Sequence, residues 1–100
     1  MFTANIRVRN NNPYDTSGVI YAGTVIETLN PFSRIQNLAV AQNVPFTIPT
    51  GQVQVVSVPA WCLNKNYTPP ASTPMRVTSL AVAKYDTQAE AWEDMERRRQ

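Results

Sequence analysis

The feature that most constrains the fold of this chain is a regular alternation of short β-type segments with turn residues. In the first segment Ala4, Ile6 and Val8 are apolar and the residues between them are polar, a two-residue period that gives a strand one buried and one wet face. Asparagines and a proline end this segment at residues 10–13. Turn residues then recur every eight to twelve positions, which predicts a mainly β, antiparallel, Ig-like β-sandwich, with a small barrel as the second possibility.

The later segments are equally short and are separated by proline, glycine or asparagine. We predict them at 19–21, 24–28, 36–41, 44–48, 53–58, 60–63 and 76–85. Gly23 predicts a bulge or a tight turn, Pro45 places its strand at a sheet edge, and Pro59 interrupts the run that precedes Ala60. Residues 64–74 contain three prolines and read as a stiffened loop.

Near the end of the chain the spacing of the core-facing residues changes from two to about 3.6. This change predicts one short helix over residues 87–98. Gln88, Trp92 and Met95 stand at i, i+4 and i+7, the spacing of one helical face, so we expect this stripe to dock on the core. Thr87 and Glu90 match a capping box, in which the hydroxyl and the carboxylate each accept the other residue's backbone N–H.

Size and composition favour one folded domain over residues 1–100. With 43% hydrophobic and 16% charged residues the chain is too apolar for intrinsic disorder. It has no histidine, the commonest general base and metal ligand, so we expect no enzyme activity, no metal site and no cofactor. Its one cysteine, Cys62, rules out an intramolecular disulfide.

Charge and hydropathy exclude two classes of partner. The net charge is +2 and the basic residues are scattered, whereas nucleic-acid binding needs cations clustered on one face. The first residues do not form a signal peptide, and no later segment is apolar over the length of a membrane span. We therefore expect neither nucleic-acid binding nor membrane insertion, and by default a location in the cytoplasm or within a larger assembly.

One constellation suggests specific chemistry. Trp61, Cys62 and Asn64 lie at a predicted strand end, and Thr87, Gln88 and Trp92 lie at the helix start. If the helix packs back on that strand end, the Cys62 thiolate could attack the Gln88 side-chain carbonyl and release ammonia. The product is an internal thioester, which a partner amine or hydroxyl could open to form a covalent link, with no histidine required.

The same segments resemble a known family. The Cys-Leu-Asn segment at 62–64 and the Thr-Gln-x-x-x-Trp segment at 87–92 are similar to the two signature boxes of bacterial surface thioester domains. The resemblance covers residues 59–96. It implies a bond between Cys62 and Gln88, supported by Trp61, Asn64, Thr87 and Trp92.

A purely structural interpretation accounts for the same residues. Free cysteine is often buried as a small hydrophobe, and a first-turn glutamine can satisfy nearby backbone groups. Because a catalytic set is absent and a small sheet protein exposes edge strands, we expect a non-enzymatic interaction or assembly module that binds another protein or its own copies, the latter as a homo-oligomer. The alternative is the covalent thioester binder with Cys62 and Gln88.

Overall fold

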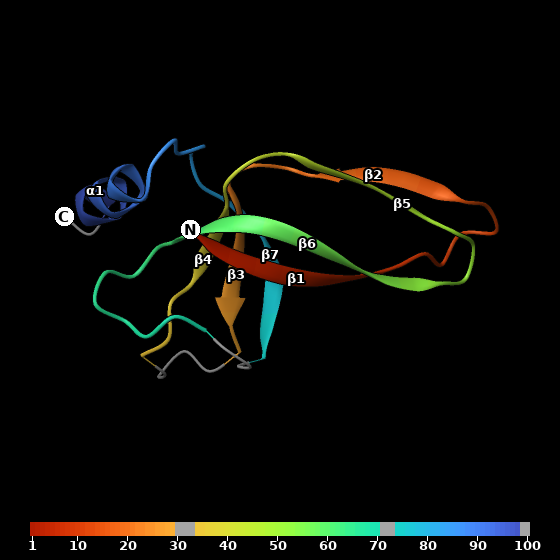
Figure 1. Ribbon diagram of the computed structural model, residues 1–100, viewed down its shortest axis with the longest axis horizontal. Helices are drawn as coiled ribbons and strands as arrows, with labels where there is room; N and C mark the ends of the chain where they lie inside the picture. Colours follow the sequence, from red (N-terminus) through yellow and green to blue (C-terminus); the bar gives the residue numbers. More distant parts are fainter. Residues whose placement is uncertain (30–33, 71–73, 99–100) are drawn as a thin grey trace.

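The computed structural model describes residues 1–29, 34–70 and 74–98, and within them the chain is mainly antiparallel β with one C-terminal helix (Figure 1). The elements are β1 (Phe2–Arg9), β2 (Thr16–Ile20), β3 (Thr24–Thr28), β4 (Leu38–Val40), β5 (Val44–Ile48), β6 (Val53–Cys62), β7 (Met75–Ala81) and α1 (Gln88–Arg98). This confirms the prediction of a mainly β, antiparallel fold with one C-terminal helix. No helix in the described part of the chain is long and apolar enough to cross a membrane.

Five strands form the main sheet, which curls into a half-barrel. Their order is β1-β6-β4-β3-β7, and every neighbouring pair is antiparallel. The alternation seen in the sequence of β1 places Ala4 opposite Val58 and Ile6 opposite Val56 on one face. β1 and β7 are the two edges of this sheet, so the half-barrel ends in two strands that are each paired on one side only.

The concave face of the half-barrel holds the larger apolar cluster. Its fully or nearly buried members come from four strands: Ala4, Ile26, Leu38, Val40, Val58 and Ala60. Phe2, Cys62 and Met75 pack against them with part of their surface exposed. Leu38 is opposite both Cys62 and Ile26, so this part of the core follows directly from the strand register.

The convex face carries a second cluster and is covered by α1. Trp61 and Leu63 flank Cys62 in the sequence, so they point to the opposite face and pack with Tyr85 and Ala91. Ala91 is fully buried, which lets the helix axis approach the sheet closely. The half-barrel therefore has a helix on its outside and an open concave side.

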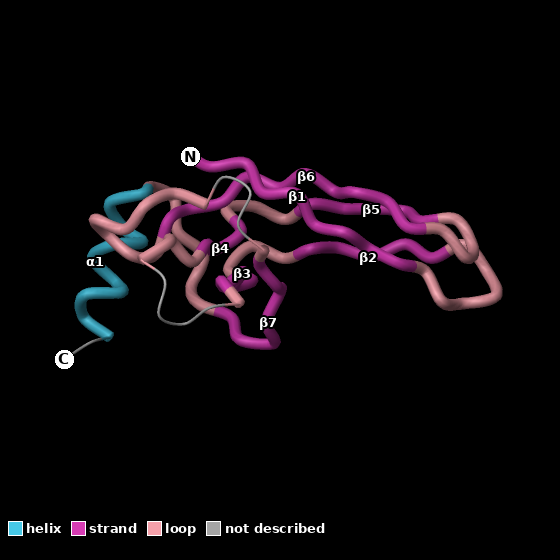
Figure 2. Tube along the Cα trace, turned by 90° about the horizontal axis from the view of Figure 1, so that it is seen from below, coloured by secondary structure: helices cyan, strands magenta, loops and turns pink. Residues whose placement is uncertain are grey.

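The remaining strands, β2 and β5, form a separate antiparallel sheet of two strands. Ile20 and Val44, at one end of this sheet, pack against the concave cluster. Together with the antiparallel pair of β1 and β6 this sheet extends away from the helix, and the molecule measures 46 Å along its longest axis (Figure 2). Pro45 lies in β5, which has one strand partner, as predicted for an edge.

Two local predictions needed correction or refinement. Pro59 does not interrupt a strand, because β6 runs continuously from Val53 to Cys62 with Pro59 opposite Thr3. Gly23 lies in a tight turn rather than a bulge: its φ is 90°, and the Thr24 N–H donates to the Tyr21 carbonyl at 3.1 Å. Of the predicted loop at 64–74, residues 71–73 lie outside the described part of the chain.

Candidate functional site

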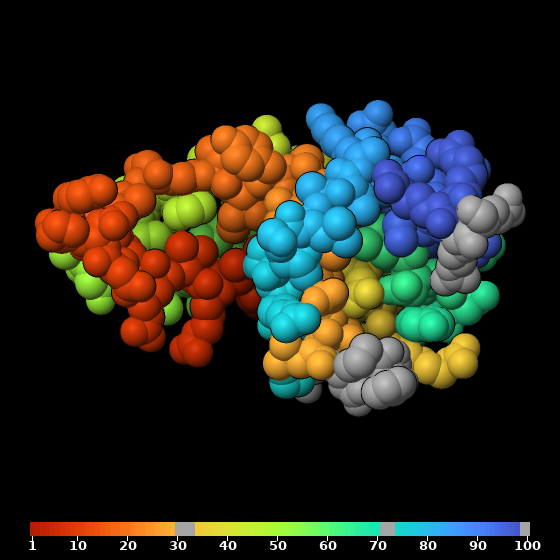
Figure 3. Space-filling model, turned by 180° about the vertical axis from the view of Figure 1, so that it is seen from behind, coloured from red at the N-terminus to blue at the C-terminus, as the bar shows by residue number. Residues whose placement is uncertain are grey.

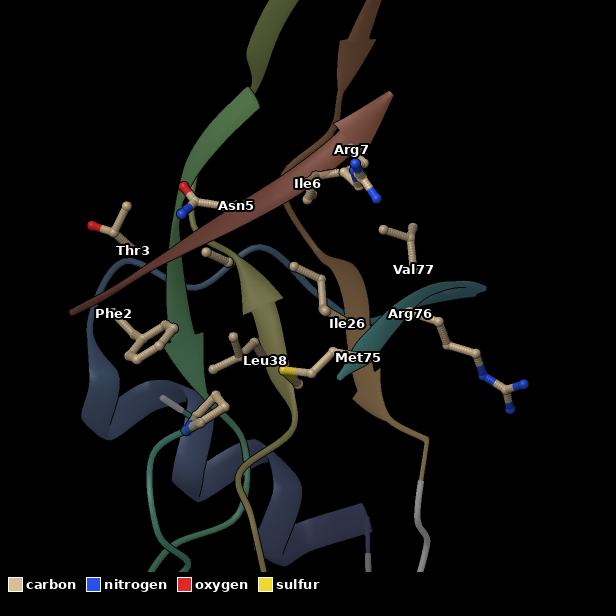
Figure 4. Close-up of a pocket in the computed structure, with 12 residues that line it drawn as sticks. Phe2, Thr3, Asn5, Ile6, Arg7, Ile26, Leu38, Met75, Arg76 and Val77 are labelled. Carbon is tan, nitrogen blue, oxygen red and sulfur yellow. The ribbon is translucent and has the colours of Figure 1, made fainter. Parts of the chain in front are cut away.

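The concave side of the half-barrel contains a groove between the two edge strands (Figure 4). The cavity has a volume of about 460 Å³, within the range of ligand pockets in proteins. Its lining comprises Phe2 to Arg7 of β1, Ile26 of β3, Leu38 of β4, Pro70, and Met75 to Val77 of β7. The groove is thus bordered along both sides by the backbone of a strand with a free edge.

The inner surface of the groove is apolar because of strand register. Val77 is opposite Ile26 and Met75 is opposite Thr28, so both β7 side chains point to the concave face. Ile26 is only 4% exposed, whereas Val77 is 48% exposed although it belongs to the same face. The core side of the sheet therefore continues into an uncovered apolar side chain at β7. The segment that contains β7 lies at the surface in the space-filling view (Figure 3, cyan).

The rim of the groove is basic. Arg7 and Arg76 line it from the two sides, and the lining residues include no acid. Arg76 pairs with Glu27 on the outer face, where the guanidinium Nη2 lies 2.7 Å from Oε1. Both arginine side chains point away from the floor of the cavity, which is formed by Ile26 and Leu38 (Figure 4).

A local irregularity limits how much of β7 can pair. Between Val77 and Ala81 the register with β3 shifts, so β7 contains extra residues relative to its partner. The Thr78 hydroxyl accepts the Leu80 N–H at 3.1 Å, which closes a small turn within the strand. Bulges of this kind block edge pairing. The regular free edge of β7 is thus Met75–Val77, the same three residues that line the groove.

The structure also brings the two predicted thioester residues, Cys62 and Gln88, together where the end of β6 meets the start of α1. The Cys62 N–H donates to Gln88 Oε1 at 2.9 Å, and Gln88 Nε2 donates to the Cys62 carbonyl at 2.6 Å. β1 starts opposite Ala60, so it does not reach this part of β6. The glutamine amide takes the place of a neighbouring strand at the end of β6.

This contact involves the main chain of Cys62 rather than its sulfur. The Cys62 side chain packs with the concave cluster, whereas α1 packs on the convex face. Burial raises the pKa of the Cys62 thiol, which reduces the thiolate fraction needed for nucleophilic attack. In this arrangement the amide of Gln88 is engaged in two hydrogen bonds and Cys62 is a core residue.

Asn64 and Thr87 have structural partners in the described chain. Asn64 Oδ1 accepts the Asn37 N–H at 2.7 Å, and the Asn64 N–H donates to Gln36 Oε1 at 2.7 Å. Thr87 Oγ1 accepts the Glu90 N–H at 3.1 Å, which confirms one half of the predicted capping box. The other half differs, since the Glu90 carboxylate accepts the N–H of Asp86, at 3.0 Å.

The structure places the two tryptophans in different surroundings. Trp61 packs in the convex cluster and its Nε1 donates to the Tyr85 carbonyl at 3.0 Å. Trp92, predicted to anchor the helix, lies at the flank of α1 with Lys65 Nζ 5.9 Å from its ring centroid. Its buried Nε1 has no hydrogen-bond partner among the described residues. The residues of α1 that reach the cluster are Ala91 and Met95.

Comparison with known proteins gives the chain no relative. No protein-family model, no curated protein and no solved structure matches it. Within residues 1–29, 34–70 and 74–98 no cluster of cysteine or carboxylate side chains could hold a metal ion. The function must therefore be argued from the groove and from the Cys62–Gln88 junction alone.

The groove was not predicted from the sequence, although part of its signal was visible. The alternation in β1 identifies Phe2, Ala4 and Ile6 as one face. Alternation does not say which strands become neighbours, so it cannot show that β1 and β7 border the same cavity.

Proposed function

We propose that this protein is a non-enzymatic interaction or assembly module that binds a protein partner through the open edges of its half-barrel. The observation that carries the proposal is the groove between β1 and β7, which combines two free strand edges with an apolar floor. Free edges are template surfaces for pairing, and natural proteins block them or use them. β7 is blocked only beyond Val77, and the part that lines the groove stays regular.

Exposed apolar side chains support the same function. Val77 and Leu80 of β7 are 48% and 62% exposed. Apolar side chains left exposed on a strand with a free edge are typical of binding sites. We interpret the two sheets as a reduced Ig-like sandwich, whose larger, curled sheet a partner strand would extend at its free edges.

Size-exclusion chromatography with light scattering, combined with affinity capture from a lysate, tests this function. We expect either a defined oligomer or a specifically retained protein partner. A strict monomer that retains nothing would contradict the proposal. A surface control is Asn11→Ala, an exposed turn position remote from the groove, which should behave like the unmodified chain.

The covalent thioester binder is the second candidate, favoured by one observation: the Gln88 side chain lies at hydrogen-bond distance from Cys62. The reaction would require the amide to leave both hydrogen bonds and the sulfur to turn from the concave core. Intact-mass measurement decides it, since the bond removes one ammonia and leaves no thiol to alkylate. A chain of full mass with a titratable Cys62 thiol would exclude it.

A further inference from the structure

We propose that the groove between β1 and β7 receives one extended peptide segment of a partner protein, inserted antiparallel to both strands so that it closes the half-barrel. The inference rests on the proposed function and specifies its site and ligand: a segment with apolar side chains at alternate positions and acidic side chains between them. Strand addition to free edges is an established mode of peptide recognition.

The direction of the inserted segment follows from the number of strands. The sheet has five strands and all four neighbouring pairs are antiparallel. β1 and β7 therefore run in the same direction. Joining them directly would create a parallel pair, whereas a single added strand that runs the opposite way is antiparallel to both edges and completes a six-stranded, fully antiparallel barrel.

The identity of the segment follows from the need for two free edges. A strand between β1 and β7 must donate and accept hydrogen bonds on both of its sides. Every described strand of this chain is already paired on at least one side, including β2 and β5, which pair with each other. A folded second copy thus offers no suitable strand among these, and the segment comes from an otherwise unpaired stretch of a different chain.

The side chains of the groove specify the composition of that segment. Inward-facing positions would contact Ile6, Ile26, Leu38, Met75 and Val77, an apolar surface. Outward-facing positions would lie at the rim beside Arg7, with no acid among the lining residues, and beside Arg76, which also pairs with Glu27 on the outer face. Apolar residues inside and carboxylates outside are complementary to both surfaces.

Peptide display on the full chain tests the insertion. A library of random ten-residue peptides is selected on the unmodified protein, and individual binders are synthesised. Val77→Lys places an ammonium in the groove, and we expect it to weaken binding about tenfold or more. Val19→Lys is the matched control on β2, in the separate two-stranded sheet and outside the groove lining, where the valine is 38% exposed, and should change the affinity by less than about twofold.

Backbone methylation distinguishes insertion from simple edge pairing. Along an extended peptide, odd and even N–H groups point to opposite sides, so one set faces β1 and the other faces β7. N-methylation of either set should weaken binding to the unmodified protein. If only one set matters, the peptide pairs with one edge: the insertion is then wrong, whereas the proposed function stands. This readout needs no variant of the protein and is independent of folding defects in Val77→Lys.

A nitroxide at the peptide amino terminus tests the direction. In the antiparallel arrangement it lies near the C-terminal ends of the lining segments, so the amide signals of Arg7 and Val77 broaden more than those of Phe2 and Met75. The reverse pattern would overturn the arrangement. Selected peptides that lack alternation, that bind Val77→Lys as well as the unmodified chain, or that are not obtained at all would also overturn it. If the insertion fails in one of these ways but light scattering still shows a defined assembly, the proposed function as an interaction module stands.

Discussion

The side-chain amide of Gln88 and the main chain of Cys62 form a reciprocal pair of hydrogen bonds, 2.9 and 2.6 Å long, that joins the start of α1 to the end of β6. A glutamine side chain offers the same donor and acceptor as a peptide group, so it can take the place of a strand where β1 does not extend. The contact fixes the helix at one end, and the packing of Ala91 fixes it against the convex face.

We predict that Gln88→Ala lowers the free energy of unfolding by about 1–3 kcal/mol, because a part-buried N–H and carbonyl lose their partners. Gln88→Glu should be at least as destabilising at neutral pH, since it keeps the acceptor and places a carboxylate oxygen against the Cys62 carbonyl. Urea denaturation measures both. The exposed Gln42→Ala is the control, and equal effects at the two glutamines would show that the junction contributes nothing.

Asn10 should be the most sensitive asparagine in the first turn. It is 4% exposed, and its Nδ2 donates to the carbonyls of Tyr14 and Ile48, each at 2.8 Å. Asn10→Ala leaves these carbonyls without that donor and the Asn12 N–H without its acceptor, and should cost about 2–4 kcal/mol. Asn11 is exposed, and Asn11→Ala should stay within about 0.5 kcal/mol. Chemical denaturation of the two variants compares them, and similar losses would contradict the assignment.

Two glycines with positive φ should respond differently to alanine. A Cβ on Gly23 would lie 2.4 Å from the Val82 carbonyl oxygen, whereas one on Gly51 would have no heavy atom within 4 Å. Gly51→Ala should therefore cost about 1 kcal/mol for the backbone conformation alone. Gly23→Ala adds the clash with a main-chain atom and should cost about 2–3 kcal/mol or more. Thermal unfolding that ranks them in the opposite order would contradict the described turn.

The two tryptophans give a direct test of helix docking. Trp61 packs in the convex cluster and donates to the Tyr85 carbonyl, so Trp61→Ala should cost about 3–5 kcal/mol. Trp92 lies beside Lys65 at the flank of the helix, and Trp92→Ala should cost less, about 1–2 kcal/mol. Denaturation experiments on both variants show which tryptophan contributes more to the free energy of unfolding. A larger loss at Trp92 would restore it as the anchor of the helix.

Alkaline pH should weaken the contact between Tyr85 and the helix. Burial, the hydrogen bond to Asp94 (2.5 Å) and the Asp94 charge raise the pKa of Tyr85 from 10.0 to about 12. The folded protein therefore keeps the phenolic proton after the unfolded chain has lost it. The resulting stabilisation is complete below pH 10.0 and disappears as the pH rises towards about 12.

Tyr85→Phe provides the comparison for this pH dependence. The variant lacks the ionisable hydroxyl, so its free energy of unfolding should fall less steeply over the same alkaline interval. Urea denaturation at several pH values gives both curves, and tyrosinate absorbance follows the titration. Parallel curves for the two proteins would show that Tyr85 does not carry the effect.

Local patterns in the sequence determined the element types. The period of two in β1 and the period near 3.6 from Gln88 onward depend only on which side chains must leave water, so they predicted strands and a C-terminal helix correctly. Thr87 was recognisable as a cap because its hydroxyl acts within one turn. The sequence also suggested that Gln88 could meet the Cys62 sulfur, whereas in the structure the Gln88 amide bonds to the main chain of Cys62 and the sulfur packs with the concave cluster.

Only the tertiary structure decided which surfaces those elements share. Trp92 and Ala91 are adjacent on the same helix, and hydrophobicity favours the tryptophan as the buried residue, but the close approach of α1 to the sheet selects the smaller side chain. Likewise β1 and β7 are more than sixty positions apart. Their placement as the two borders of one groove depends on strand order, curl and register, which alternation leaves open because any strand with the same period presents an equivalent apolar face. The groove between them is a consequence of that global arrangement.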